Sequence, residues 1–173
     1  MTRPPFRFEP LSEAHDRNAF HCGEEALDRY FQTQVTQDIR RRITNCFLAI
    51  EAETGQIAAY YTLSAASVAL TELPPEETKR LPRYPTLPAV RIGRLAVDEK
   101  FHRRGLGASM LMNAVHRTLR DAAAAYALLV DAKNNSATAF YEHHGFRALA
   151  GQPRTLFLPL ATAQKALFKK APH

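Results

Sequence analysis

A glycine-rich bend between two regular segments carries the clearest chemical signal in the chain. The run RIGRLAVDEKFHRRGLGAS, residues 91–109, has the pattern of an apolar strand, a short charged turn and a bend that opens into a helix. Gly105 and Gly107 allow the backbone to turn tightly and to approach a ligand closely. The first amides of a helix have no partner within it, so they favour an anion in the bend. The spacing therefore predicts a pyrophosphate-binding site.

A second run, NNSATAFYEHHGF at residues 134–146, places a tyrosine on a predicted helix. Ala137, Phe140, Tyr141 and His144 fall at helical spacing, and Gly145 stands where a helix stop belongs. A phenol can serve as a general acid. An aromatic residue at this spacing is also typical of a core, and the spacing alone leaves both interpretations open. Phe140 is the better core candidate of the two aromatic neighbours.

The remaining segments form the elements that must position these residues. Apolar residues at four-residue steps predict an amphipathic helix that begins near Glu24 and ends at Arg40–Arg42. A strand, a hairpin and a proline-rich loop fill the first half, and two more strands lie in the second half. The order predicts a mixed α/β sheet with helices on its faces. The expected strands cover residues 6–11, 45–52, 56–70, 90–97, 126–131 and 155–160, and the loop covers residues 73–90.

Composition limits the class of protein. With 173 residues and 46% apolar content, the chain is expected to form a single domain over residues 1–173. The first residues lack a signal-peptide pattern, and the longest apolar run is too short for a membrane span, which predicts a cytoplasmic protein. Cys22 and Cys46 are far apart and are expected to be buried reduced thiols. The seven histidines show no metal-binding spacing, so no metal is expected.

The net charge of +6 and the pI near 9.6 favour an anionic partner without naming it. The cluster at Arg40–Arg42 has two interpretations. Cations at a helix C-terminus offset the negative end of the helix dipole, and cations on a surface can also contact phosphates. Arg91 and Arg94 lie on the strand that leads into the bend, where alternation sends their side chains to opposite faces.

The two runs together resemble the GNAT N-acetyltransferase superfamily. Its pattern is Q/R-x-x-G-x-G/A after the fourth strand and N-x-x-A-x-x-x-Y-x-x-x-G-F later in the chain. The resemblance implies a GNAT fold: a mixed, mostly antiparallel sheet of six or seven strands flanked by about four helices. It also implies a splay between two strands that receives acetyl-CoA. The chain departs from the pattern at His102, which stands where the family prefers Gln or Arg.

A narrower resemblance covers nearly the whole chain. The segments FHCGEEALDRYFQTQVTQD and YYTLSAASV, the proline-rich loop and the run R-I-G-R-L-A-V are similar to the GNAT toxins of bacterial type II toxin–antitoxin modules, the TacT/AtaT group. The resemblance implies an enzyme that moves acetyl from acetyl-CoA to the α-amino group of aminoacyl-tRNA and so stops translation. It also implies a homodimer and a ribbon-helix-helix antitoxin that neutralises the toxin and, in complex with it, binds operator DNA as a repressor.

The resemblance assigns roles to particular residues. Tyr141 matches the family's catalytic tyrosine. Two alternatives to the toxin function remain, namely a small-amine or protein N-acetyltransferase on the same scaffold and a non-catalytic acyl-CoA-binding regulator. The implied acetyl-CoA contacts are Leu95, Ala96, Val97, His102, Arg103, Arg104, Gly105, Leu106, Gly107, Ala108, Asn134 and Ser136. The candidate tRNA contacts are Arg40, Arg41, Arg42, Arg83, Arg91 and Arg94.

Overall fold

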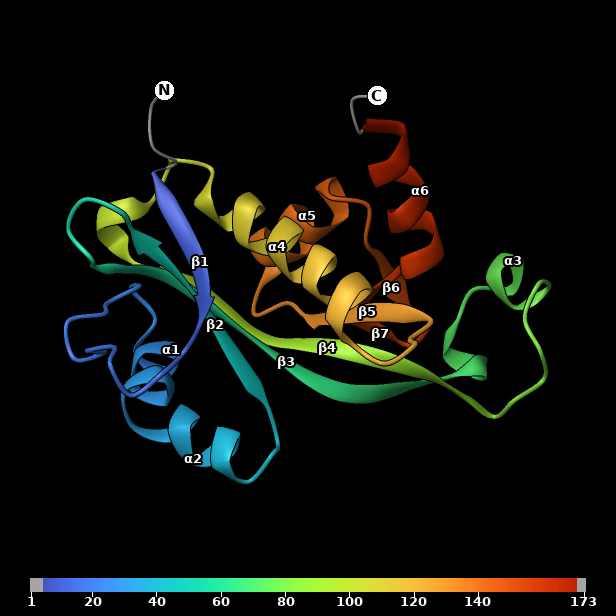
Figure 1. Cartoon of the computed structure of the whole chain (residues 1–173). Helices are drawn as coiled ribbons and strands as arrows, with labels where there is room; N and C mark the ends of the chain where they lie inside the picture. Colours follow the sequence, from blue (N-terminus) through green and yellow to red (C-terminus); the bar gives the residue numbers. More distant parts are fainter. Residues whose placement is uncertain (1–4, 171–173) are drawn as a thin grey trace. The chain divides into compact units, whose positions relative to one another are not determined.

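A computed structural model describes residues 5–170, and the chain divides into two compact units. The first unit comprises Met1–Ser64 and Gly93–Ala114, and the second comprises Ala65–Ile92 and Val115–His173. Seven strands are hydrogen-bonded in the order β1-β2-β3-β4-β5-β7-β6, which agrees with the expected mixed sheet (Figure 1).

The helices and strands follow the predicted order closely. The strands are β1 (Phe6–Pro10), β2 (Asn45–Glu51), β3 (Ile57–Ala69), β4 (Thr86–Val97), β5 (Ala127–Asp131), β6 (Arg147–Leu149) and β7 (Gln152–Pro159). The α-helices are α1 (Glu25–Arg29), α2 (Val35–Arg40), α3 (Pro75–Thr78), α4 (Leu106–Asp121), α5 (Asn135–His143) and α6 (Leu160–Lys170). A π-helical turn joins α1 to α2, and 3-10 turns precede α3 and α4.

In the first unit, two adjacent tyrosines of β3 anchor helices on the two faces of the strand. β1 pairs antiparallel with β2, and β2 pairs antiparallel with β3. Successive strand side chains point to opposite faces. The Tyr60 hydroxyl donates to the Leu27 carbonyl of α1 at 2.8 Å, whereas the Tyr61 hydroxyl donates to Asn113 of α4 at 2.5 Å. Both rings are fully buried, so one strand fixes α1 and the first half of α4 together.

The helix predicted from Glu24 to Arg42 is present from Glu25 to Arg40, but its middle turn, Tyr30–Gln34, is π-helical. The Arg17 guanidinium donates to the Phe31 carbonyl at 2.6 Å, and the Thr33 hydroxyl donates to the Arg29 carbonyl at 2.7 Å. Side-chain donors that take helix carbonyls in this way disturb the regular hydrogen-bond ladder. The apolar face nevertheless stays on the core, where Phe31 stacks on Tyr60 with ring centroids 4.3 Å apart.

The second unit is built on a short parallel strand pair. β4 pairs parallel with β5 from Ala89 to Ile92, and β5 and β6 both pair antiparallel with β7. β4 continues beyond this pairing to Val97. The core of the unit comprises the buried side chains of Val68, Leu73, Leu87, Ala89, Ala127, Leu129, Leu149 and Phe157.

The proline-rich excursion between β3 and β4 is braced by polar contacts. The Tyr126 hydroxyl donates to Glu77 at 2.8 Å, and Arg147 also pairs with Glu77. Glu72 accepts a hydrogen bond from Gln152 and a second from the Ala69 amide at 3.0 Å. The helical turn expected at residues 76–79 is present as α3, and β6, only three residues long, is a strand that the sequence pattern did not reveal. Among residues 5–170, no helix is long and apolar enough to cross a membrane.

Candidate active site

The predicted acetyl-CoA contacts belong to two places in the fold. The first is the end of β4 with the bend that leads into α4, and it lies in the first unit. The second is α5 with the residues just before it, and it lies in the second unit.

At the bend, the backbone adopts a conformation suited to an anion. Arg103 has φ +64° and Gly105 has φ +74°, so two residues of left-handed conformation lie within three positions. A side chain in that conformation is strained, and such strain is typical of functional turns. In the first turn of α4, the Ser109 amide donates to the Gly105 carbonyl at 3.2 Å. The amides of residues 106–108 precede it, in the position where a helix binds phosphate.

Asp98, which the sequence pattern marked only as the end of a strand, holds the segment before the bend. It is 2% exposed, and its carboxylate accepts from the His21 amide at 3.0 Å and from the Lys100 amide at 2.9 Å. It therefore caps the 3-10 turn Glu99–Phe101 and also ties this turn to the loop before α1. An aspartate at the start of a short helical turn is the sequence signal that could have identified it.

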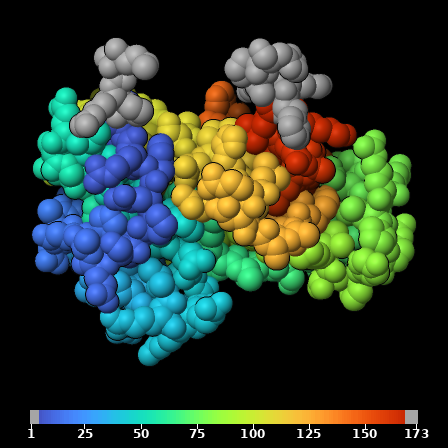
Figure 2. All heavy atoms as spheres, viewed as in Figure 1, coloured from blue at the N-terminus to red at the C-terminus, as the bar shows by residue number. Residues whose placement is uncertain are grey.

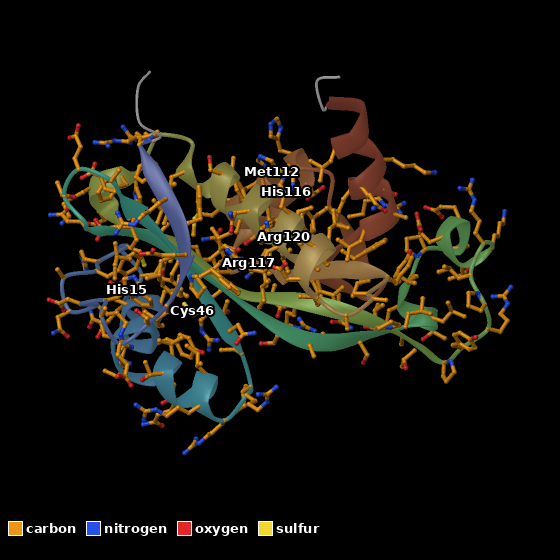
Figure 3. The ribbon with its side chains drawn as sticks, in the orientation of Figure 1. His15, Cys46, Met112, His116, Arg117 and Arg120 are labelled. Atoms are coloured by element: carbon orange, nitrogen blue, oxygen red, sulfur yellow. The ribbon has the colours of Figure 1, made fainter. Side chains whose placement is uncertain are left out.

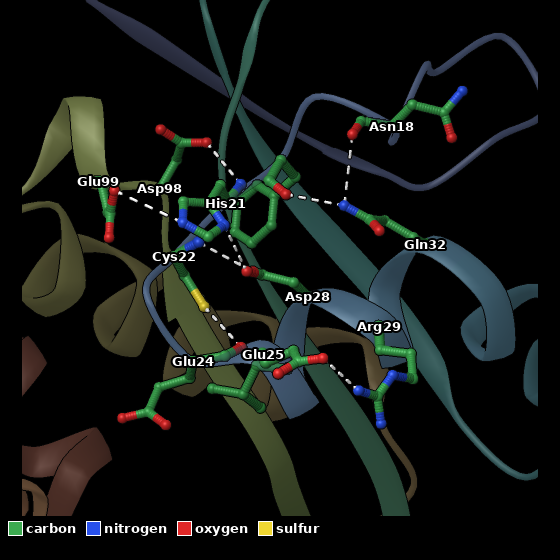
Figure 4. A network of polar contacts seen from close by, with 12 residues as sticks. Asn18, His21, Cys22, Glu24, Glu25, Asp28, Arg29, Gln32, Asp98 and Glu99 are labelled. Atoms are coloured by element: carbon green, nitrogen blue, oxygen red, sulfur yellow. Dashed lines mark hydrogen bonds and ion pairs between the residues drawn. The ribbon is translucent and has the colours of Figure 1, made fainter.

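The loop that Asp98 holds is itself part of a polar network (Figure 4). The His21 ring lies 2.9 Å from the buried carboxylate of Asp28 and 3.8 Å from the exposed carboxylate of Glu99. Asp28 also accepts from the Cys22 amide at 2.8 Å, and the Glu99 amide donates to the His21 carbonyl at 2.9 Å. The network fixes the start of α1 against the turn that precedes the bend.

The strand residues Leu95, Ala96 and Val97 lead from β4 into the bend. Just before them, the Arg94 amide donates to the buried Thr62 hydroxyl at 3.1 Å. A side chain at Gly93 would place a Cβ 3.2 Å from that same hydroxyl, so glycine permits this approach. Ala96 faces the aromatic core of the first unit, and Leu95 and Val97 are half-buried.

Tyr141, on α5, is more buried than its neighbour Phe140, which reverses the expectation that Phe140 is the core residue. Tyr141 is 7% exposed and packs edge-to-face on Phe140 and Phe146, with centroids 5.3 and 5.6 Å away. α5 ends in a tight turn in which the Phe146 amide donates to the Tyr141 carbonyl at 3.1 Å and Gly145 has φ +94°. The helix end and the two rings therefore hold the phenol in place.

The hydroxyl of Tyr141 differs from those of the other buried or half-buried tyrosines. Tyr30 and Tyr126 donate to carboxylates of Asp38 and Glu77, and the two tyrosines of β3 also have partners. The Tyr141 hydroxyl makes no hydrogen bond with any residue of the described range 5–170. Its O–H is therefore available to a ligand.

The surroundings of Tyr141 keep its proton in place. Burial, and to a lesser degree the negative charge of Asp131, raise the pKa of Tyr141 to about 12. The phenol is therefore protonated at neutral pH and can donate a hydrogen bond. A general acid needs this state, and a general base would need the opposite one.

The two other predicted contacts near α5 lie at its start. Asn134 caps the helix, because its side-chain oxygen accepts from the Ala137 amide at 2.9 Å. Ser136 is exposed in the first turn. The asparagine of the second motif thus has a structural role in this chain, whatever it contacts in addition.

The six candidate tRNA contacts fall into two groups, arginines that already contact another side chain and arginines that form no ion pair. Arg91 pairs with Asp131 at 2.6 Å, and the Arg94 guanidinium lies over the Tyr30 ring, 3.4 Å from its centroid. Arg83 and the cluster at Arg40–Arg42 are exposed and form no ion pair with any described residue. In Figure 2 the end of α2 and the turn after it, coloured light blue to cyan, lie at the surface. No ion pair within residues 5–170 therefore competes with an anionic partner for these cations.

Other reactive groups lie outside this arrangement. Cys22 and Cys46 are buried and form no disulfide. Burial raises the pKa of Cys46, labelled in Figure 3, to about 12, so its thiol is inert. Within the described residues, no three His, Cys, Asp or Glu side chains gather as a metal site. Met112, His116, Arg117 and Arg120 lie along α4 (Figure 3). Arg117 forms an ion pair with Asp121 in the same helix, at 3.7 Å.

Comparison with known proteins agrees with these features. The family model of the acetyltransferase (GNAT) domain matches residues 18–155. A tRNA-acetylating toxin of Mycobacterium tuberculosis is 31% identical over 156 residues, which cover 89% of this chain and 92% of the relative. A probable toxin TacT of Sinorhizobium fredii is 24% identical over 169 residues, 92% of this chain and 93% of the relative.

Solved structures give the same result. A tyrosine-to-phenylalanine mutant of KacT has a TM-score of 0.86 and 27% identity, over 94% of this chain and 99% of that one. AtaT complexed with acetyl-methionyl-tRNAfMet has a TM-score of 0.83 and 29% identity, over the same shares of the two chains. Other relatives are AtaT with the C-terminus of the antitoxin AtaR, AtaTR with acetyl-CoA, and a KacTA–DNA complex. The chain belongs to the GNAT acetyltransferase family.

Proposed function

We propose that this protein is the toxin of a type II toxin–antitoxin system and that it acetylates the α-amino group of aminoacyl-tRNA with acetyl-CoA as donor. The observation that carries the chemical part is the buried phenol of Tyr141, whose hydroxyl has no partner in the described residues. The similarity to a tRNA-acetylating toxin over 89% of the chain supports the choice of substrate. The bend provides the amides, from Arg103 to Ala108, that are expected to bind the pyrophosphate.

The chemistry is the attack of a neutral amine on a thioester. The amine nitrogen forms a bond to the carbonyl carbon, the carbon–sulfur bond breaks, and the sulfur leaves with the electron pair. We assign Tyr141 as the acid that donates its proton to this sulfur. The proton lost by the attacking nitrogen passes to water, and a proton from water restores the phenol. The phenol of Tyr141 is in its acid form at neutral pH, and its raised pKa keeps it so at higher pH.

The proposed acceptor suits a site without a dedicated base. A free α-amine has a pKa of about 7.7–8.0, so a useful fraction is neutral at physiological pH. A lysine side chain, with a pKa of about 10.4, would need a positioned base. We expect the main-chain groups of Leu95, Ala96 and Val97 to pair with the pantetheine arm, and an amide near Val97 to polarise the thioester carbonyl.

The basic residues support an RNA acceptor to different extents. Arg40–Arg42 and Arg83, which form no ion pair with described residues, are the stronger candidates for phosphate contacts. Arg91 and Arg94 remain candidates, although each already has a partner, namely Asp131 for Arg91 and the Tyr30 ring for Arg94.

The decisive experiment is the transfer of radiolabelled acetyl from acetyl-CoA to a pool of charged tRNA. Uncharged tRNA and the Tyr141→Phe protein serve as controls. Label that appears only on charged tRNA, and only with intact Tyr141, would establish the acceptor and the acid. Charged tRNA that stays unlabelled while acetyl-CoA still binds would refute the toxin assignment.

The same experiment, extended to arginine variants, tests the RNA surface. The triple change of Arg40, Arg41 and Arg42 to Gln is expected to raise KM for charged tRNA without altering KM for acetyl-CoA. Arg29→Gln is the matched control, because Arg29 lies on the same helical segment but pairs with Glu25. Equal KM values for tRNA in the two proteins would remove the cluster from the interface.

Further proposals concern assembly. We propose that the chain forms one functional domain, acts in the cytoplasm as a homodimer and is neutralised by a ribbon-helix-helix antitoxin. With that antitoxin it would bind operator DNA and repress its own operon. The AtaT–AtaR and KacTA–DNA complexes support an antitoxin partner and a DNA-bound state by similarity. A small ribbon-helix-helix gene next to the toxin gene, and co-purification of its product, would test the proposal.

A small-amine or protein N-acetyltransferase is the alternative enzyme, and a non-catalytic acyl-CoA-binding regulator is the alternative of another class. Neutralising Arg40–Arg42 should weaken only the tRNA enzyme. Tyr141→Phe should remove catalysis from either enzyme and leave the acetyl-CoA affinity of a regulator intact.

A further inference from the structure

A half-buried histidine, His144, stands at the end of the helix that carries Tyr141. The proposed chemistry gives this residue no role. Its amide, its ring nitrogen and its ring face nevertheless each contact the last turn of α5, and all three contacts bear on how firmly Tyr141 is held.

The end of α5 is a Schellman motif in which Tyr141 is a member. The Phe146 amide donates to the Tyr141 carbonyl at 3.1 Å, and the Gly145 amide donates to the Glu142 carbonyl at 3.0 Å. Gly145 has the left-handed conformation, φ +94°, that this motif uses. The packing of the Tyr141 ring on Phe146 is the apolar contact that accompanies such a terminus. The position of Tyr141 therefore depends on how the terminus is closed.

The side chain of His144 adds a further bond to this terminus. The His144 amide donates to the Tyr141 carbonyl at 3.0 Å, whereas the regular α-helical acceptor would be the Phe140 carbonyl. That carbonyl bonds to the ring of His144, whose Nδ1 atom lies 2.8 Å from it. A carbonyl can only accept, so Nδ1 carries the hydrogen. Carbonyls near the end of a helix lack main-chain donors, and this bond satisfies one of them.

The ring of His144 also extends a row of aromatic rings. It lies 4.7 Å from the Phe140 ring, and Phe140 packs edge-to-face on Tyr141 at 5.3 Å between centroids. Phe146 follows Tyr141 in the row. Tyr141 and Phe146 are buried, whereas Phe140 and His144 are half-buried. His144 therefore covers part of the ring that packs on Tyr141, and this contact restricts the motion of that ring.

We propose that His144 is a positioning residue for the proton transfer. Its Nδ1–H fixes the last turn of α5, and its ring holds Phe140 against Tyr141, while Tyr141 remains the acid. This inference rests on the proposed function, because it presupposes that Tyr141 protonates the leaving sulfur. An acid must reach one particular atom, and a small displacement slows the reaction. The contribution of His144 should therefore affect kcat and not the affinity for acetyl-CoA.

Three substitutions at this one position separate the two contacts. His144→Ala removes both, His144→Asn keeps a donor without the ring, and His144→Phe keeps a ring without the donor. His144→Ala should lower kcat for transfer to charged tRNA about tenfold and leave KM for acetyl-CoA within about twofold. His144→Asn and His144→Phe should each recover part of the loss. His116→Ala, at an exposed histidine of α4, is the control and should keep the wild-type kcat.

A double-mutant cycle with Tyr141→Phe tests whether His144 acts through the phenol. The residual transfer by the Tyr141→Phe protein is measured with enzyme in excess. His144→Ala should cause no further loss in that protein, because the proton that His144 helps to place is absent. An equal loss in both backgrounds, or a wild-type kcat for His144→Ala, would overturn the proposal. If His144→Ala does not fold, the cycle uses His144→Asn and His144→Phe with the same criterion.

Failure of the proposed function would give a different result. A wild-type protein that leaves charged tRNA unlabelled would refute the proposed acceptor. A Tyr141→Phe protein with the wild-type kcat would refute the proposed acid. An activity that depends on Tyr141 but not on His144 would refute only the positioning role.

Discussion

The bend between β4 and α4 and the tyrosine of α5 contribute to the proposed site in different ways. The bend is exposed, has two left-handed residues and acts mainly through main-chain amides. Tyr141 is buried between two aromatic rings and contributes one hydroxyl. Many amides share the work of binding an anion, whereas a proton comes from a single atom. Substitutions in the bend should therefore lower the affinity for acetyl-CoA only in part, whereas loss of the tyrosine hydroxyl should remove most of the activity.

The largest effect is expected for Tyr141→Phe. Loss of the general acid should lower kcat by about 10²–10⁴-fold, with little change in acetyl-CoA affinity or melting temperature. Tyr126→Phe is the matched control in the same unit, because its hydroxyl bonds to Glu77 at 2.8 Å and has no assigned role in catalysis. It should reduce stability by about 1 kcal/mol and leave kcat intact. Equal kcat values for the two variants would remove Tyr141 from the chemistry.

The second largest effect is expected for Gly105→Ala in the bend. Gly105 has φ +74°, and a Cβ added there would meet no atom within 4 Å, so alanine would add strain without a clash. The strain of about 1 kcal/mol should shift the bend and raise KM for acetyl-CoA several-fold, with a smaller change in kcat.

Gly55→Ala provides the control for that substitution. Gly55 has the same φ of +74° and equally open surroundings, but it lies in the turn between β2 and β3. Its stability loss should match that of Gly105→Ala, while KM for acetyl-CoA should not move. A rise in KM in both variants would indicate that general destabilisation, and not the shape of the bend, determines the affinity.

A smaller effect is expected for Asp98→Asn, which alters the support beneath the bend. The amide can accept through one oxygen only, so one of the bonds from the His21 and Lys100 amides is weakened. Stability should fall by about 1–2 kcal/mol, and KM for acetyl-CoA should rise about twofold. Asp16→Asn, at an exposed aspartate that accepts from the Asn18 amide, should change neither quantity. An unchanged unfolding midpoint in Asp98→Asn would show that the cap is dispensable.

The smallest effect concerns pH. Because burial raises the pKa of Tyr141 to about 12, its acid form should persist, and kcat should not fall between pH 8 and pH 10 through this group. The folded-state pKa lies above the unfolded value of about 10, so the stability contributed by the neutral phenol is present below pH 10 and is lost as pH rises toward 12. Stopped-flow measurement of the acetyl-transfer rate from about pH 8 to pH 11 tests this prediction. If the pKa of Tyr141 were the ordinary value, the rate would fall with a midpoint near pH 10.

Much of the fold follows from local patterns. The bend at Gly105 and Gly107, the helix after it and the stop at Gly145 were predictable because glycine and apolar spacing report the local backbone directly. The helix predicted from Glu24 to Arg42 is present from Glu25 to Arg40, but the π-helical turn in its middle was not predicted, because it involves Arg17, from a separate loop, which donates to the Phe31 carbonyl. No local pattern contains such a contact.

The sequence by itself determined the order of the elements, the glycine bend and the presence of a tyrosine at helical spacing, since these depend on neighbours along the chain. Only the tertiary structure decided that Tyr141 is more buried than Phe140 and that its hydroxyl lacks a partner among the described residues. It also decided that His102 contacts Val97 and that Arg104 contacts Glu51. Burial and partner choice depend on residues that folding brings together from distant positions, and side-chain charge alone does not specify them.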